Sequence, residues 1–422
     1  MKVLLFGPPT TDGLKALGEN VTISGGGWVE NLISLLKQES SVELFSLFYC
    51  NKLISPLFSR YDNVTYIGLP ERVKGLKCCN KKMVNDLLMV YEKVSPDVVH
   101  IIGTEREHNY SLFKIVGSNK CIISITGIVG ECAKNYFAGM KKTEYGKVSL
   151  GDFIRRTSIR KEKKLFEKWS VTEKKLIKEG KFFMGRTEFD KSYIEQLNPN
   201  ARYYYCSEVL NDSFYNDRWD GNKVIKYSIF VSQASYPLKG FHTLLKAMPL
   251  VLEKYPESVC FVAGANITKS DSIIDKIKKT SYSKYISKLI KTFDLNKHIK
   301  FLGPLSSKQM KEQYEKCNVF VLPSHIENSS NALGEAMSLG MPIVASFVGG
   351  TPSLVEHNKS AFLFPCNDER MLAYYICKIF DEEESARLLG ESAYQSSKYR
   401  FNRDEILNQT LCAYKELVEN NE

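Results

Sequence analysis

The sequence predicts an α/β protein with two domains, each built on a doubly wound parallel sheet. The chain has 422 residues, which is long for one core of ordinary size, so about two domains are expected. Short apolar runs alternate with stretches of helical periodicity, as in parallel strands joined by helices. This alternation occurs twice, on either side of a polar and aromatic stretch at 211–222. We therefore predict a first domain over 1–215, a second over 216–400, and a C-terminal helix over 401–422 that returns to the first domain.

The composition indicates a globular protein with a basic surface. Hydrophobic residues make up 43% of the chain and charged residues 25%, which are values of folded domains rather than of disordered or fibrous chains. The net charge of +10 suits an anionic partner such as a nucleotide phosphate, a lipid surface or a nucleic acid. The basic residues are spread along the chain without a recognition motif, so we do not expect nucleic-acid binding.

Cysteines and apolar runs bear on the cellular compartment. The 11 cysteines are odd in number and scattered through apolar patterns, and they lack paired zinc-ligand spacing. We expect reduced, buried thiols in a cytosolic protein. No run of about 18 apolar residues occurs, so no membrane-spanning helix is expected. The N-terminal run MKVLLFGPP is broken by proline too early for a signal peptide and is expected to form the first strand.

The first domain opens with a strand, a glycine loop and a helix. The loop is Ser24-Gly25-Gly26-Gly27, and helical spacing follows over 28–36. This order is typical of a nucleotide-binding βα unit, in which glycines let N–H groups approach a diphosphate or sugar. Three glycines alone fit a flexible surface loop equally well. The strands expected in this domain are 3–6, 42–48, 64–67, 97–102, 121–125 and 182–187, the last of which should end the sheet.

Residues 151–180 form a basic amphipathic segment. Ten Lys and Arg residues are interleaved there with apolar ones such as Phe153, Ile154 and Trp169, which predicts helix. One hypothesis is adsorption to an anionic membrane surface near a lipid-linked acceptor. The alternative is a solvated helix whose apolar side packs on its own domain, and the many acidic residues in the segment favour it. The similarly basic stretch 269–300 is expected to be plain surface.

The second domain repeats the βα pattern. Loops at the carboxyl ends of parallel strands are where open α/β sheets bind ligands. With two such domains we expect a cleft between them, and such a cleft is a common place for a small-molecule site. The strands expected in this domain are 227–231, 258–263, 299–302, 319–322, 343–345 and 361–364.

The stretch 318–350 carries the most informative pattern. After the strand, Pro323 and a polar run lead into a helix that Gly340 ends, and Gly349-Gly350 follows the next strand. Those two glycines allow a ligand to approach the backbone closely. Glu327 in the loop and Glu335 about one turn into the helix have seven residues between them. The N–H groups at the start of this helix favour phosphate.

Three side chains in the second domain are suited to a nucleotide-linked ligand. Glu335 could accept two hydroxyl hydrogen bonds from a ribose, and Glu327 could do the same for sugar hydroxyls. Lys239, beside Gly240 after strand 227–231, could neutralise phosphate. The alternatives are that both acids complement the helix dipole and that the lysine lies in a surface turn. Glycoside hydrolysis by the two acids would require both carboxyls to face one bond.

Other chemistries lack their motifs. The six histidines show no metal-ligand spacing, and Asp-x-Asp, nucleophile-elbow and Walker patterns are absent. We therefore expect no metal, no cofactor beyond a co-substrate, and neither hydrolase nor kinase chemistry.

In combination, these residues resemble the retaining glycosyltransferases of family 4, also called group 1, which have the GT-B fold. That fold consists of two Rossmann-like domains with parallel sheets that face each other across a cleft. The segment 185–190 with Asn198-Pro199 resembles a branch that builds bacterial surface polysaccharides. The residues that carry the resemblance are Lys239-Gly240, Phe301-Leu302-Gly303, Pro323-Ser324, the Glu327/Glu335 pair, Gly349-Gly350, Gly25-Gly26-Gly27 and Asp97-Val98-Val99-His100.

The resemblance implies a metal-independent hexosyltransferase that retains the anomeric configuration. A nucleotide-diphosphate sugar would bind mainly to the second domain, with Glu335 at the ribose, Lys239 at the diphosphate and Glu327 at the donor sugar. Lysine and helix N-termini would stabilise the leaving diphosphate, and the acceptor proton would pass to a donor phosphate oxygen. Further donor contacts are expected from Gly25, Gly26, Gly27, Gly303, Asn328, Ser329, Ser330 and Asn331. A glycan or lipid-linked glycan acceptor would enter from the first domain, with His100, Glu105, His108, Thr126 and Arg186 as candidate contacts.

Two positions depart from the family pattern. The family commonly has an arginine five residues before the lysine, where this chain has Ala234. Arg186 or another basic residue is the candidate replacement. The family's frequent histidine after the fifth first-domain strand is Thr126 here, which leaves His100, Glu105 or His108 to contact the donor sugar.

The leading hypothesis is therefore a bacterial, cytoplasmic glycosyltransferase of surface polysaccharide biosynthesis, with peripheral contact to the inner membrane face. One alternative is a nucleotide-sugar epimerase on the same fold, which needs no acceptor. The other is a nucleotide-sugar binding module without catalysis, suggested by the positions of Ala234 and Thr126.

Overall fold

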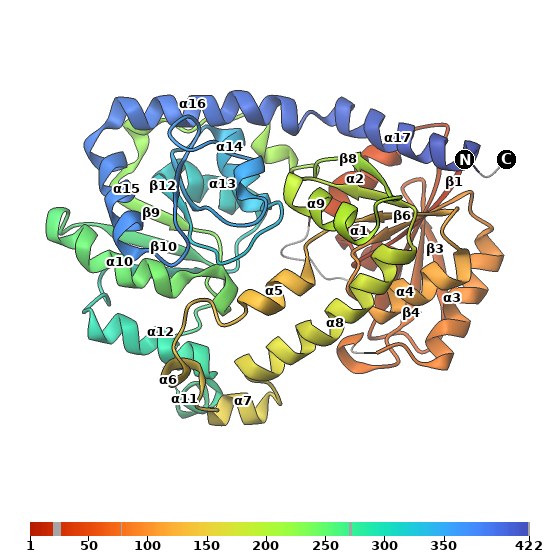
Figure 1. The fold of residues 1–422 in the computed structure, drawn as a ribbon, viewed down its shortest axis with the longest axis horizontal. Coiled ribbons are helices and arrows are strands. Elements are labelled where there is room, and N and C mark those ends of the chain that lie inside the picture. The colour runs from red at the N-terminus through yellow and green to blue at the C-terminus, as the bar shows by residue number, and fades with distance from the viewer. Residues whose placement is uncertain (20–26, 77, 270–271, 421–422) are drawn as a thin grey trace. The chain divides into compact units, whose positions relative to one another are not determined.

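The computed structural model describes residues 1–19, 27–76, 78–269 and 272–420, and it consists of two compact units (Figure 1). Unit 1 contains Met1–Gly130, Lys168–Asn211 and Phe401–Glu422, and unit 2 contains Glu131–Glu167 and Asp212–Arg400. Each unit is built on one largely parallel sheet with helices packed against both faces. The predicted α/β class with two doubly wound sheets is confirmed.

The sheet of unit 1 has eight strands in the order β3-β4-β2-β1-β5-β6-β7-β8. All neighbouring strands are parallel except β3, which pairs antiparallel with β4 at one edge. The strand bounds are β1 (Lys2–Phe6), β2 (Glu43–Cys50), β3 (Leu57–Tyr61), β4 (Val64–Pro70), β5 (Val98–Ile102), β6 (Cys121–Ser124), β7 (Phe182–Gly185) and β8 (Arg202–Tyr205).

Two separate apolar clusters lie on the two faces of this sheet. One contains side chains of α3, α4, α9 and the end of α8, and the other contains side chains of α2 and α17. Successive residues of β1 alternate between them, with Leu4 and Phe6 in the first and Val3 and Leu5 in the second, as strand geometry requires. The helices are α1 (Thr11–Ala16), α2 (Trp28–Leu36), α3 (Lys81–Val94), α4 (Glu107–Val116), α9 (Glu188–Leu197) and α17 (Arg403–Glu419), with the 3₁₀ turn η1 (Lys74–Leu76).

The sheet of unit 2 has six strands in the order β11-β10-β9-β12-β13-β14, and all pairs are parallel. The bounds are β9 (Ile225–Val231), β10 (Val259–Ala263), β11 (Ile299–Gly303), β12 (Cys317–Leu322), β13 (Ile343–Ser346) and β14 (Phe362–Phe364).

Helices cover both faces of this second sheet as well. Side chains of α10, α12 and α15 share one apolar cluster, and side chains of α13 and α14 share the other. The helices are α6 (Lys142–Tyr145), α7 (Leu150–Ile154), α10 (Phe241–Lys254), α11 (Ile273–Lys278), α12 (Ser281–Thr292), α13 (Ser307–Lys316), α14 (Asn331–Leu339), α15 (Glu369–Asp381) and α16 (Glu383–Arg400). The 3₁₀ turns are η2 (Asp212–Phe214), η3 (Gly221–Lys223), η4 (Pro237–Lys239) and η5 (Thr351–Ser353).

Two helices belong to both units. α5 (Val129–Asn135) begins in unit 1 and continues in unit 2, and α8 (Ile159–Glu179) begins in unit 2 and ends in unit 1. Residues 131–167, which the sequence analysis placed in the first domain, therefore lie in unit 2. The physical reason is their apolar packing, because Tyr136, Met140 and Ile159 are buried in the cluster formed with α10, α12 and α15.

Two strands of unit 1 were not predicted. β3 lies at one edge of the sheet and is largely exposed, and β8 lies at the other edge. β8 corrects the expectation that 182–187 ends the sheet. Edge strands bury little of each residue, so their sequences lack the continuous apolar run by which the central strands were recognised.

The basic segment 151–180 contains α7 and most of α8. On α8 the apolar residues are packed, with Leu176 and Ile177 buried in the core of unit 1 and Phe166 packed against the core of unit 2. This packing agrees with the alternative hypothesis, in which the segment is a solvated helix whose apolar side packs within the protein. On α7, by contrast, Phe153 and Ile154 are exposed.

All 11 cysteines are free thiols. Within the part of the chain that the structure describes, no helix has the length and apolar character needed to cross a bilayer.

Candidate functional site

Three neighbouring strands of unit 2 end at the same edge of the sheet and carry the candidate site. β9, β12 and β13 are adjacent and parallel, so the loops that follow them meet at the carboxyl edge. Lys239 ends the 3₁₀ turn η4 after β9, and Glu327 lies in the loop between β12 and α14. The sequence analysis placed both residues at this edge, and the structure brings them into contact.

Lys239 and Glu327 form an ion pair. Lys239 Nζ donates to Glu327 Oε1 at 2.6 Å, and the two side chains are only 20% and 11% exposed. The Ser324 hydroxyl donates to the same carboxylate oxygen at 2.7 Å. Burial by itself would lower the pKa of Lys239, but the carboxylate of Glu327 outweighs it and holds the pKa above its usual value. Lys239 is therefore a charged ammonium that also hydrogen-bonds the Tyr236 side chain, which leaves one N–H donor for another anion.

Glycines fix the two loops that carry this pair. Gly240 has a φ of +67°, and a Cβ there would lie 1.7 Å from the carbonyl oxygen of Pro323. Gly349 has a φ of +47°, and its Cβ would lie 2.0 Å from the carbonyl oxygen of Glu327. Gly350 N–H donates to that same oxygen at 3.0 Å. The close approach that Gly349-Gly350 permits is thus made to the backbone of Glu327.

The helix α14 begins directly after this loop. Ser330 is its N-cap, with the hydroxyl oxygen accepting from Leu333 N–H at 3.4 Å, and Gly340 ends it at a φ of +72°. Asn328 and Ser330 are buried, Asn331 is the first helical residue, and Ser329 accepts from Arg400 Nη2 at 3.4 Å. The free N–H groups of its first turn lie at the carboxyl edge beside Glu327.

Glu335 has a different partner from Glu327. The hydroxyl of Tyr314, a fully buried residue of α13, donates to Glu335 Oε2 at 3.0 Å. Burial raises the pKa of Glu335 to about 7, although the hydrogen bond from Tyr314 lowers it. Sequence reasoning missed Tyr314, because a single tyrosine in a polar helix gives no signal of its tertiary partner.

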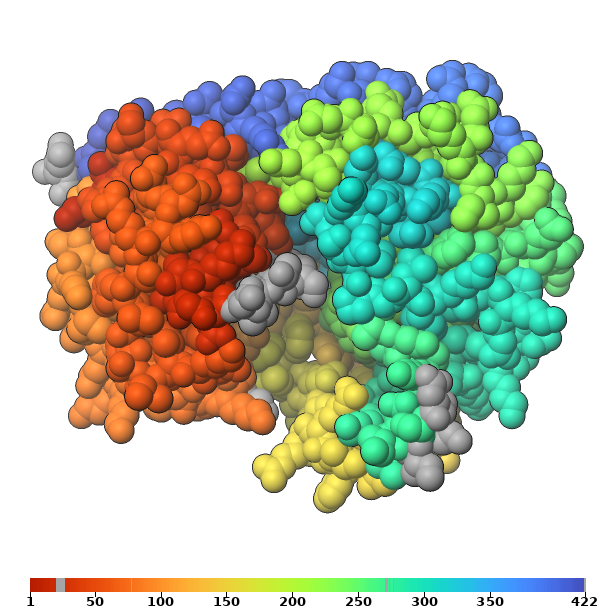
Figure 2. All heavy atoms as spheres, turned by 180° about the vertical axis from the view of Figure 1, so that it is seen from behind, coloured from red at the N-terminus to blue at the C-terminus, as the bar shows by residue number. Residues whose placement is uncertain are grey.

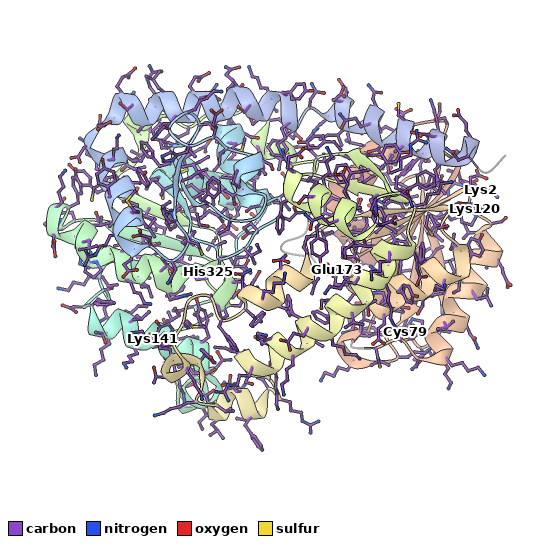
Figure 3. The ribbon with its side chains drawn as sticks, viewed as in Figure 1. Lys2, Cys79, Lys120, Lys141, Glu173 and His325 are labelled. Atoms are coloured by element: carbon purple, nitrogen blue, oxygen red, sulfur yellow. The ribbon has the colours of Figure 1, made fainter. Side chains whose placement is uncertain are left out.

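Two histidines pack next to the same loop. The rings of His325 (labelled in Figure 3) and His242 are stacked with centroids 5.2 Å apart. His325 Nε2 lies 3.3 Å from the Thr243 hydroxyl, and His242 Nε2 lies 2.7 Å from the carbonyl oxygen of Ala138. Burial lowers the pKa of His325 to about 4 and that of His242 to about 3. Both rings are therefore neutral at physiological pH, and they support the loop by packing.

The remaining predicted donor residues have separate positions. Gly25 and Gly26 lie outside the described residues, and Gly27 caps the start of α2 in unit 1 with open space around it. Gly303 ends β11 with a φ of +80°, and its carbonyl accepts from Gly264 N–H at 2.9 Å. Ala234, where the family commonly has arginine, is buried in the core of unit 2.

In unit 1, His100 is a core residue with both ring nitrogens engaged. Nδ1 lies 2.6 Å from the Tyr414 hydroxyl and Nε2 lies 2.6 Å from the Ser124 hydroxyl. Burial lowers its pKa to about 3, so the ring is neutral. His108 is also buried, and its ring lies edge-on to Phe6 and Tyr49.

Arg186 is buried as well. Its guanidinium stacks 4.0 Å from the ring of Trp28, and its Nε lies 3.7 Å from Glu208 Oε2, with Glu208 fully buried. Arg186 therefore has a charge partner within unit 1.

Glu105 and Thr126 lie close to each other and to a carboxylate that the sequence analysis did not select. A Cβ added to Gly103 would meet both Glu105 Oε2 and the Thr126 hydroxyl. Glu173 (Figure 3), fully buried on α8, accepts from Val129 N–H at 2.7 Å and Gly130 N–H at 2.9 Å. Burial raises its pKa to about 7, opposed by those two hydrogen bonds and assisted by nearby Glu105. In the sequence, Glu173 looks like one more acid on a solvated basic helix.

Over the described ranges, no group of three or more His, Cys, Asp or Glu side chains is arranged to hold a metal ion.

Comparison with solved structures identifies the fold of the chain. The chain aligns over 99% of its length with sucrose-phosphate synthase from Thermosynechococcus elongatus, at 99% coverage of that chain, TM-score 0.72 and 15% identity. It aligns over 97% with HepE from Anabaena in complex with UDP and glucose, at 98% coverage of that chain, TM-score 0.63 and 14% identity. The two parallel-sheet units are those of the GT-B fold.

A family model matches most of unit 2. Residues 216–396 match the profile of the family described as glycosyl transferases group 1. The amylovoran biosynthesis glycosyltransferase AmsK from Erwinia amylovora is 30% identical over 132 residues, which are 30% of this chain and 31% of that protein. The matched stretches span about half or less of the curated relatives' length. The chain thus has the GT-B fold, and its second unit is similar to the group 1 glycosyl transferases.

Proposed function

We propose that the protein is a retaining glycosyltransferase that moves a sugar from a nucleotide-diphosphate sugar to a glycan or lipid-linked glycan. The observation that carries the proposal is the Lys239–Glu327 pair, held by Gly240 and Gly349 at the carboxyl edge of the unit that matches the group 1 profile. A largely buried ammonium beside two helix starts is suited to bind a diphosphate.

The diphosphate would bind between Lys239 and the first turn of α14. Lys239 uses one of its three N–H donors on Glu327 and another on the Tyr236 side chain in the unliganded chain. The third donor is offered to a phosphate oxygen. The N–H groups at the start of α14 add partial positive charge. This arrangement stabilises the negative charge that develops on the leaving diphosphate without a metal ion.

The two carboxylates would divide the rest of the donor between them. Glu335 would accept the ribose hydroxyls, which replace or share the hydrogen bond from Tyr314. Glu327 would accept hydroxyls of the transferred sugar once the diphosphate draws Lys239 away from it. The Ser324 hydroxyl donates to the carboxylate of Glu327, and the Gly350 N–H donates to its backbone carbonyl. Both contacts are independent of Lys239, so they hold the backbone and the carboxylate when the ion pair loosens.

The reaction exchanges one bond at the anomeric carbon. The bond between that carbon and the diphosphate oxygen breaks, and a bond to the acceptor hydroxyl oxygen forms on the same face. The acceptor proton passes to the departing diphosphate oxygen, so charge and atoms balance without an external base.

We also propose that the acceptor belongs to a bacterial surface polysaccharide and that the enzyme works in the cytoplasm next to the inner membrane. The similarity to a glycosyltransferase of amylovoran biosynthesis supports the acceptor class. The UDP in the complex of HepE makes uridine-diphosphate sugars the first donors to test.

The test is the release of nucleoside diphosphate by the purified chain, with and without a glycan acceptor, across a panel of nucleotide sugars. We expect Lys239→Ala to reduce turnover about 100-fold, because one preorganised charge donor at a leaving group is worth about that much. Lys226→Ala is the matched control, since Lys226 is exposed at the amino end of β9. The anomeric configuration of the product, followed by NMR, tests retention.

Two outcomes would replace the proposal. An epimerised donor formed without acceptor would identify a nucleotide-sugar epimerase. Tight donor binding with no turnover across the whole panel would identify a binding module. At present the comparisons favour neither alternative.

A further inference from the structure

One surface of unit 2 has several exposed apolar side chains on two neighbouring helices. α7 and α11 lie side by side (Figures 1 and 2). Phe153 is 75% exposed, and the other five side chains are between 38% and 65% exposed. Single exposed apolar residues are ordinary, but a cluster of this kind marks a binding surface. We call it the α7–α11 face, and it consists of Val148, Leu150, Phe153, Ile154, Ile274 and Ile277.

The face is built on a fixed scaffold. Gly151 lies so close to α11 that a Cβ would meet the carbonyl oxygen of Lys279 at 2.3 Å. Ser149 Oγ donates to that same carbonyl at 2.8 Å, and both carboxylate oxygens of Asp152 accept from Ser281 N–H at 3.1 Å. The polar side of α7 is thus attached to the junction of α11 and α12, and Phe153 and Ile154 are left in solvent.

Basic residues surround this face, and its three acids bind backbone N–H groups. The segments 141–160 and 272–279 together contain nine Lys and Arg but only three acids. Asp152 binds backbone N–H groups, Asp275 accepts from Ser272 N–H at 3.2 Å, and Glu144 accepts from Lys141 N–H at 2.6 Å. Asp152 is buried and the other two acids are half-buried, so most of the exposed charges are cationic. Among them are Lys141 (labelled in Figure 3), Lys147, Arg155, Arg156 and Lys278.

We infer that the α7–α11 face docks on an anionic lipid bilayer, with Phe153 and Ile154 inserted at the headgroup boundary. Aromatic and branched apolar side chains next to Lys and Arg are the composition of interfacial membrane anchors. Each Lys or Arg close to an anionic surface adds to the electrostatic attraction. This binding is independent of glycosyl transfer and of the Lys239–Glu327 site.

The charge distribution favours a lipid surface over a second copy of the chain. Two α7–α11 faces brought together would juxtapose like charges around their apolar centres, which disfavours association. An anionic bilayer satisfies the apolar and the basic parts at once.

The experiment is co-sedimentation of the full chain with vesicles of equal parts phosphatidylglycerol and phosphatidylcholine, compared with phosphatidylcholine alone. We expect binding to the anionic vesicles that weakens as salt is raised. The double variant Phe153→Glu/Ile154→Glu and the double variant Lys147→Glu/Arg155→Glu should each bind at least about tenfold more weakly. All four side chains are exposed, so thermal unfolding should stay as in the parent.

Matched controls come from other surfaces of unit 2. Leu388→Glu/Tyr399→Glu replaces two exposed apolar residues of α16, and Lys226→Glu/Lys297→Glu reverses two exposed charges. Both should sediment with anionic vesicles like the parent.

Equal binding to both vesicle types, no binding to either, or unchanged binding by the α7–α11 variants would overturn the inference. A concentration-dependent dimer that the Phe153→Glu/Ile154→Glu variant abolishes, in a chain that ignores vesicles, would instead assign the face to a second copy.

Discussion

Glu335 is the residue whose environment departs most from that of an ordinary surface acid in the candidate site. Its carboxyl is largely surrounded by protein, with the Tyr314 hydroxyl as hydrogen-bond partner. Because burial disfavours the carboxylate, its pKa is raised from 4.5 to about 7. Such a group holds its proton more tightly in the folded chain than in the unfolded one.

This raised pKa makes stability depend on pH in a defined direction. The free energy of unfolding that Glu335 contributes falls as pH rises from about 4.5 to about 7, because the native state binds more protons over that window. Glu335→Gln removes the titration, so between pH ~5 and ~8 the variant should gain about 2 kcal/mol relative to the parent. Urea unfolding of both proteins at the two pH values measures this.

Glu257→Gln, at an exposed position, is the control for the effect of the substitution itself. Glu173 titrates in the same direction but is present in both proteins, so its contribution cancels. A stability difference between Glu335→Gln and the parent that is constant with pH would show that the Glu335 carboxyl is not perturbed.

At the scale of the element, the loop between β12 and α14 is shaped by contacts that only glycine allows. Gly349 approaches the backbone of Glu327, and Gly240 approaches the backbone of Pro323, both at positive φ. These contacts position Glu327 and the start of α10 without any side chain of their own.

Replacing either glycine should therefore disturb the site as well as the fold. Gly349→Ala places a Cβ 2.0 Å from the Glu327 carbonyl oxygen, which forces a backbone shift and strain at positive φ of about 1–3 kcal/mol. We expect a lower melting temperature and weakened donor binding. Gly117→Ala is the control for donor binding, because Gly117 follows α4 in unit 1 at a φ of +86° and no described atom lies within 4 Å of its Cβ position. It should bind the donor like the parent. If Gly349→Ala kept the melting temperature and the donor affinity of the parent, the close contact between Gly349 and the backbone of Glu327 would be ruled out.

Some of these elements could be predicted from the sequence and others could not. The strands β9 and β12 and the helix α14 were predicted because apolar runs, a proline and a terminal glycine mark them locally. The edge strands β3 and β8 bury too little to show that pattern. Lys239 and Glu327 were predicted as neighbours of one ligand, but their direct ion pair depends on tertiary geometry. Likewise, spacing could not show that Tyr136 and Ile159 pack in the core of unit 2.

At the scale of the whole molecule, the last helix completes the core of unit 1. Residues of α17 pack against α2, β5, β6 and β8, and Tyr414 reaches His100 across 314 positions of sequence. The sequence predicted the helix and named His100 as a candidate contact for the acceptor. The partner that accounts for the buried ring could only be seen in the structure.

Tyr414→Phe should consequently destabilise the chain by about 1–3 kcal/mol, because it leaves a fully buried His100 nitrogen without its partner. Chemical denaturation of the variant measures the loss. Tyr399→Phe, at a side chain 81% exposed, should be neutral. Equal stability of Tyr414→Phe and the parent would mean that this hydrogen bond contributes nothing.

The central claim is that unit 2 binds a nucleotide-diphosphate sugar at Lys239. The most direct measurement is a thermal-shift screen of nucleoside diphosphates and their sugars on the parent, Lys239→Ala and Lys226→Ala. A true donor at about 100 times its Kd should stabilise the parent by about 2.7 kcal/mol, or roughly 5 °C or more. Lys226→Ala should respond equally and Lys239→Ala far less. No shift with any compound, or an undiminished shift in Lys239→Ala, would contradict the claim.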